Sequence, residues 1–297
     1  MPARSPVPPL GVLATTLAAC GGGPAPSPSP APADAPPATS AAAPGPAAGP
    51  SRFTWSAGRR TIEVRTDATV TRDAPAAATG GPPAGDQHVT TVAYLSADLA
   101  PADAPGAVAV TGTVDSLVAA SPAPTTLVAG LRYRAASDAR GVRVEAADPA
   151  VDLRCTAPTG AAALSALGAV RDALPRIPAG LAAGANWRDT TVTASCAGPV
   201  LLVAQTVARY ESAADPAAPG RLRVTRQTTT TARGAGTAGV RPLAVTASGT
   251  ARAVYALDPA RGQLVDGTSE GRAAVTIALA GVAQRFTQQT RTQVTVR

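Results

Sequence analysis

Apolar and polar side chains alternate with a period of two along most of the chain from Arg60 onward. The first such segment places Ile62, Val64, Ala68 and Val70 on one face and Glu63, Arg65, Asp67, Thr69 and Thr71 on the other. In the last segment, the apolar face holds Val282, Phe286, Val294 and Val296. Antiparallel strands that bury one face and expose the other have this pattern. With turn-forming strings such as 137–141 and 258–262 between segments, the chain is predicted to contain about ten to twelve strands.

One segment has a helical period instead. Leu164, Leu167, Val170 and Leu174 recur at spacings of three and four residues. Thr159 stands before them as a candidate N-cap, and Pro175 ends the run. We expect one amphipathic helix, whose apolar stripe packs on the sheet and closes one side of any cavity beneath it.

The expected fold is therefore mainly β, of the α+β kind. It consists of a large curved antiparallel sheet, or half-barrel, with one amphipathic helix. A closed β-barrel or two β-sandwich-like halves would satisfy the same pattern.

The N-terminal residues differ from the rest of the chain. Residues 10–19 form an apolar run shorter than the about 20 residues that span a bilayer, and Cys20 follows directly. Residues 21–50 are rich in proline and alanine and carry one charge, Asp34, so they have too little apolar surface to fold. The string Leu17-Ala18-Ala19-Cys20 resembles the lipobox of bacterial lipoproteins, in which the cysteine is acylated and the preceding peptide is removed.

This resemblance implies a signal peptide over residues 1–19, a lipidated cysteine and tether over 20–51, and an antiparallel β domain over 52–297. The membrane is then a partner through acyl chains such as palmitate on Cys20. The expected location is the bacterial cell envelope, outside the cytoplasm, at the outer membrane or cell surface.

Cys155 and Cys196 are the other two cysteines. An even pair in an exported domain predicts a disulfide bond.

A distinctive local string begins at Pro175 and continues through Gly184, Trp187 and Asp189. It resembles a P-x-x-P … G-x-x-W-x-D arrangement in bacterial envelope lipoproteins with long antiparallel strands, over about 40 residues. Trp187 is expected to anchor the returning strand in the core, with Asn186 and Asp189 in the turn before it. A platform that stacks on a ligand is the alternative.

The basic residues are all arginine, and the net charge is +7. Residues 221–297 hold 11 of the 26 arginines against three acids, Asp258, Asp266 and Glu270. Solvated strand faces or attraction to an anionic surface would both explain this asymmetry. Export argues against a nucleic-acid partner.

Two strings resemble catalytic or cofactor motifs. Residues 267–271 spell G-x-S-x-G, but the next run alternates as a strand and the one histidine, His88, lies far upstream. Residues 234–239 spell G-x-G-x-x-G, but no helix follows, so we interpret them as a flexible loop. Asp148 and Asp152 flank a turn and are expected to serve it. We therefore expect no enzyme activity, no cofactor and no metal site.

Two functional hypotheses remain. The layout resembles the half-barrel lipid carriers of the bacterial envelope, which implies a concave face that binds a lipid or another apolar ligand. Alternatively, the basic strands, rich in threonine and glutamine, dock an anionic envelope surface or a partner protein. A large apolar hollow would favour the first hypothesis, and a packed interior the second.

Overall fold

A computed structural model describes residues 52–73, 86–102, 107–120, 124–138 and 141–297. The signal peptide, Cys20 and the tether lie outside these residues.

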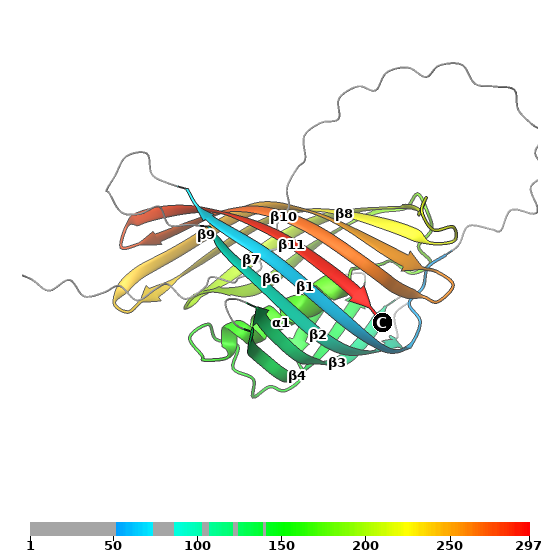
Figure 1. Cartoon of the computed structure of the whole chain (residues 1–297), viewed down its shortest axis with the longest axis horizontal. Helices are drawn as coiled ribbons and strands as arrows, with labels where there is room; N and C mark the ends of the chain where they lie inside the picture. Colours follow the sequence, from blue (N-terminus) through cyan, green and yellow to red (C-terminus); the bar gives the residue numbers. More distant parts are fainter. Residues whose placement is uncertain (1–51, 74–85, 103–106, 121–123, 139–140) are drawn as a thin grey trace, which may run out of the picture.

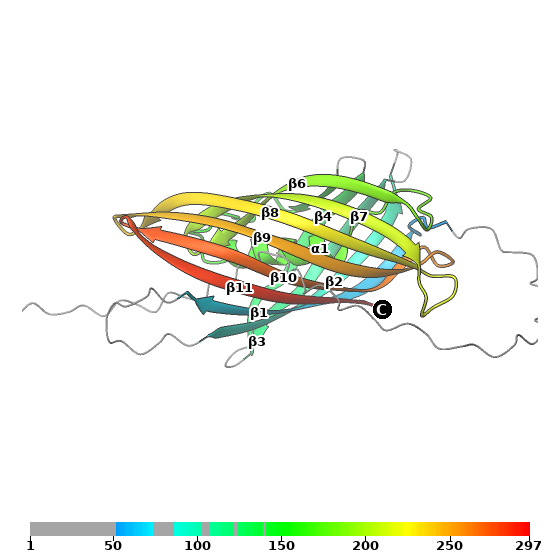
Figure 2. The same ribbon diagram turned by 90° about the horizontal axis from the view of Figure 1, so that it is seen from above.

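The described residues form eleven strands and one helix in a nearly closed, barrel-like antiparallel sheet (Figures 1 and 2). The strands are β1 (Gly58–Arg72), β2 (Gln87–Pro101), β3 (Val108–Ala120), β4 (Pro124–Asp138), β5 (Gly141–Ala146), β6 (Asn186–Ala197), β7 (Val200–Ala214), β8 (Leu222–Ala238), β9 (Arg241–Asp258), β10 (Gln263–Leu279) and β11 (Val282–Val296). The predicted mainly-β fold, with a curved antiparallel sheet and one helix, is confirmed.

The strand order is β5-β4-β3-β2-β1-β11-β10-β9-β8-β7-β6. Two meanders, β1–β5 and β6–β11, are therefore joined where β1 pairs with β11, from Ile62 opposite Val296 to Arg72 opposite Phe286. The short strand β5 and strand β6 form the two edges of the sheet and approach each other.

Helix α1 (Gly160–Ala173) lies between these edges on the concave side of the sheet and contacts β1 to β6 (Figure 1). Leu167, Val170 and Leu174 are buried in the main core, whereas Leu164 is only half-buried. Thr159 occupies the N-cap position, but its side chain makes no capping hydrogen bond. In the described part of the chain, no helix has the length and apolar character needed to cross a membrane.

The buried side chains form two apolar clusters. The larger one includes α1, Leu95, Tyr133 and Leu257, and the smaller one, near the other end of β7–β10, includes Val200 and Val245. Polar side chains on the inner face of β1, β8 and β11 lie in the rows between them: Thr66, Thr228, Thr230, Gln288, Thr290 and Thr292. The interior is therefore divided by a polar band, not continuously apolar.

The expectation that the G-x-G-x-x-G string forms a flexible loop is wrong. Gly234 and Gly236 lie within β8, and Gly239, with φ of +62°, lies in the β8–β9 turn. A Cβ on Gly234 would come within 2.3 Å of the Leu201 carbonyl oxygen. Glycine is needed here because residues 200–202, at the start of β7, lie against this point of β8.

A disulfide joins Cys155, before α1, to Cys196, near the end of edge strand β6, with Cα atoms 5.4 Å apart. The predicted bond is confirmed.

Replacing both cysteines with serine should lower the free energy of unfolding by about 2–4 kcal/mol, because the bond restricts the unfolded chain. The change is measured as a shift of the urea midpoint against oxidised wild type. Reduced wild type serves as the matched control and should unfold at the variant's midpoint. Equal midpoints for all three proteins would contradict this prediction.

Candidate functional site

Charged side chains meet inside the sheet around Arg226 of β8. Its guanidinium carbon lies 5.4 Å from the centre of the Tyr255 ring, a cation–π arrangement. Side chains alternate between the two faces along β8, so Arg226 points to the same inner face as Val224 and Thr228, two residues to either side. This places a positive charge beside Asp172 of α1 and within electrostatic range of Asp189 of β6.

Burial raises the pKa values of both carboxyl groups above the ordinary value for aspartate. For Asp172, Arg226 and then Arg171 oppose this effect; for Asp189, Arg176 and then Arg226 do so. The hydroxyl of Tyr210 donates to Asp189 Oδ2 over 3.5 Å, and burial raises the pKa of Tyr210 to about 12. Arg226 of β8 therefore interacts electrostatically with carboxyl groups on both the helix and β6.

A cavity of about 110 Å³ lies between α1 and strands β6 to β8. Leu164, Ser165 and Gly168 line its helix side, together with Arg171 and Asp172. Its sheet side consists mainly of hydroxyl-bearing residues: Thr191, Thr193, Ser195, Thr206, Thr228 and Thr230. The helix therefore packs its apolar stripe on one part of the sheet and turns its polar side toward the polar band across this cavity.

The Gly184–Trp187–Asp189 string belongs to the same region. The Trp187 indole stacks on Tyr210, with ring centres 4.9 Å apart, and its Nε1 donates to the Arg176 carbonyl oxygen over 3.2 Å. Gly184, with φ of +85°, lies just before β6. The expected turn placement of Asn186 and Asp189 is wrong, because β6 begins at Asn186 and Asp189 is a buried residue within that strand.

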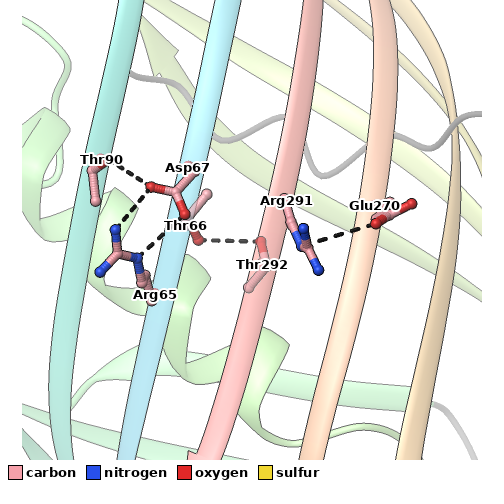
Figure 3. A network of polar contacts seen from close by, with 7 residues as sticks. All are labelled: Arg65, Thr66, Asp67, Thr90, Glu270, Arg291 and Thr292. Atoms are coloured by element: carbon pink, nitrogen blue, oxygen red, sulfur yellow. Dashed lines mark hydrogen bonds and ion pairs between the residues drawn. The ribbon is translucent and has the colours of Figure 1, made fainter.

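The outer surface of the sheet carries a ladder of polar side chains across β2, β1, β11 and β10 (Figure 3). Thr90 donates to Asp67 over 2.5 Å, and Arg65 Nε lies 3.3 Å from the same carboxylate. Arg291 stands opposite Asp67 in the register, and its Nε lies 3.9 Å from Glu270 on β10. The Thr90 hydroxyl, followed by the two arginines, holds the pKa of Asp67 below its usual value.

This ladder continues across the remaining strands. One residue of each further strand lies in the same row, each opposite the next in the register: Glu270 of β10, Arg252 of β9, Gln227 of β8, Arg209 of β7 and Arg188 of β6. We define the basic face as the outward-facing residues of β6–β11 from this row to the β6–β7, β8–β9 and β10–β11 turns. It contains seven arginines, Arg188, Arg209, Arg233, Arg252, Arg272, Arg285 and Arg291, and one acid, Glu270.

The basic face keeps most of its charge available to solvent. The Arg291 and Glu270 side chains are each 72% exposed, and such exposed pairs contribute little to stability. The rest of the face consists mainly of threonine, serine, glutamine and alanine. Its arginines therefore form a surface suited to binding anions.

Most of the other polar residues singled out in the sequence serve local structure. Asp148 accepts from the Ala150 backbone N–H, and Asp152 pairs with Arg154, so both serve local turns. His88 pairs with Thr69 on the outer surface, 2.9 Å between Nδ1 and Oγ1, whereas Ser269 lines a small internal space with Asp172. Among the described residues, no group of three or more histidine, cysteine or acidic side chains could hold a metal ion.

Comparison of the chain with protein-family models, curated proteins and solved structures finds no match.

Proposed function

We propose that this chain is a lipid-anchored, non-enzymatic protein of the bacterial envelope whose β domain docks an anionic surface through the basic face. The observation that carries the docking proposal is the excess of seven arginines over one acid on that face. Arginine guanidinium groups bind phosphate and carboxylate through paired hydrogen bonds. The anchor rests on the Leu17–Cys20 string.

Carriage of a lipid has less support. Four cavities lined by described residues measure about 10 to 110 Å³, and most residues around the one of about 110 Å³ bear a hydroxyl or a charge. Pockets for small-molecule ligands usually measure about 300–1,000 Å³ and are mostly apolar. These four cavities are therefore too small to enclose an acyl chain, and the one of about 110 Å³ is also too polar.

Docking is tested with heparin–agarose as the anionic probe. Full-length protein carrying Cys20→Ser, which removes the proposed acylation site, is eluted with a salt gradient. A triple variant, Arg252→Gln with Arg272→Gln and Arg291→Gln, should elute at clearly lower salt, because fewer counterions are exchanged on binding.

The matched control removes the same charge from the outer surface of β4 and β5, as Arg132→Gln with Arg134→Gln and Arg143→Gln. It should elute close to the parent protein. An equal loss in both variants would mean that net charge alone governs retention, and passage of the parent protein at low salt would refute docking.

A further inference from the structure

Two neighbouring turns present aliphatic side chains to solvent at one end of the sheet. Val240 in the β8–β9 turn is 98% exposed, and Val282 at the start of β11 is 67% exposed. Both turns lie at the left end of Figures 1 and 2. We call residues 238–243 and 279–285 the hairpin end. The exposure of Val282 corrects its expected place on the buried face.

The hairpin end is supported by folded structure beneath it. Leu243 of β9 stands opposite Leu279 of β10, and both are half-buried. Below them, Val245 belongs to the smaller apolar cluster, and Ile277 packs against it. The exposed valines are therefore held at the end of an apolar column instead of standing alone on a polar surface.

The hairpin end carries positive charge. Arg241 and Arg285 are exposed, and the longer stretches 227–257 and 271–297 contain no acidic residue. Asp73, which follows β1, is the neighbouring acid, and its carboxylate accepts a hydrogen bond from Thr287 over 3.1 Å. The hairpin end thus combines exposed aliphatic side chains with an excess of arginine over acid, which suits the boundary between the anionic headgroups and the apolar chains of a bilayer.

We infer that the hairpin end inserts into an anionic lipid bilayer, with Val240 and Val282 entering the interface while Arg241 and Arg285 contact lipid phosphates. This inference rests on the proposed docking function and names its surface. A bilayer is favoured over a protein partner because protein hot spots are rich in tryptophan, tyrosine and arginine together, and the hairpin end has no aromatic residue. Interfacial binding grows with both inserted apolar area and attraction to anionic lipid.

The test is co-sedimentation of the full-length Cys20→Ser protein with vesicles of phosphatidylcholine alone or with about one third phosphatidylglycerol. The protein should bind the mixed vesicles and leave the neutral ones unbound. Val240→Ser with Val282→Ser keeps the net charge and should weaken partitioning about tenfold, because it removes the apolar part of the contact. The control, Tyr94→Ser, alters an exposed apolar side chain on the outer face of β2, outside both the basic face and the hairpin end, and should bind like the parent.

Equal binding by the Val240/Val282 variant and the parent would overturn insertion. Equal binding to both kinds of vesicle would overturn recognition of anionic lipid. Each result is separable from the docking proposal, because heparin retention depends on the arginines and should be the same in the valine variant. If the parent protein is not retained by heparin, the proposed docking function itself is refuted.

Discussion

Replacing Arg226 with alanine should lower the free energy of unfolding by about 3 kcal/mol, near the lower end of the range for breaking a buried charge pair. Arg226 is the principal cation opposing the burial of Asp172 and contributes to the balance at Asp189. Its removal leaves both carboxylates less compensated and also ends the contact with the Tyr255 ring.

The change is measured as a shift of the urea midpoint at neutral pH with an unchanged slope. Arg252→Ala is the matched control, because Arg252 is an exposed residue on the outer face of the neighbouring strand and should shift stability by less than about 0.5 kcal/mol. Equal midpoints for the two variants would mean that Arg226 does not hold the interior charges.

Leu167→Ala should cost about 2–5 kcal/mol, the range for removing a large side chain from a packed core. Leu167 is 3% exposed on the face of α1 that joins the main apolar cluster. The helix has few other large apolar side chains, since much of its buried face is alanine: Ala163, Ala166 and Ala173. One leucine therefore supplies a large share of the contact between helix and sheet.

Thermal and urea melts of this variant are compared with Leu201→Ala, which shortens an exposed leucine on β7. The control should melt within a degree or two of wild type. A Leu167→Ala melt that matches wild type would show that α1 is peripheral to stability.

The alternation of side chains predicted the strands where their two faces differ strongly in polarity. In β4, Leu131, Tyr133 and Ala135 are buried while Arg132 and Arg134 are exposed, as the pattern indicates. The helix was predicted for the same reason, because the spacing of its leucines fits no strand and Pro175 ends it. Local patterns of this kind depend only on near neighbours in the chain.

The pattern fails where polar residues occupy both faces. In β8, the inner face continues from Val224 to Arg226, Thr228 and Thr230, while the outer face carries Gln227 and Thr229. The two faces of the strand then do not differ in polarity, so the sequence pattern could not show that Arg226 and its neighbours point inward. A charged residue in phase with buried neighbours is the signal that could have identified Arg226.

The wrong predictions for Gly234, Gly236 and Val282 also have physical reasons. Gly234 and Gly236 were interpreted as a loop because the string leads into another strand without a helix, yet they lie near the end of β8 and make room for residues 200–202 of β7. Val282 keeps the phase of its strand but stands at the turn, beyond the residues that could cover it. Both outcomes depend on neighbours distant in sequence or on position within the sheet.

The pairing of β1 with β11 sets the order in which this domain can be completed during synthesis. Strand β1 is made first, but one of its edges stays unsatisfied until β11, made last of the eleven, arrives beside it. A chain interrupted before β11 would expose β1 and β10 as open edges of 15 and 17 residues. Long open edges recruit strands from other molecules, so shortened products of this chain are candidates for aggregation and proteolytic clearance.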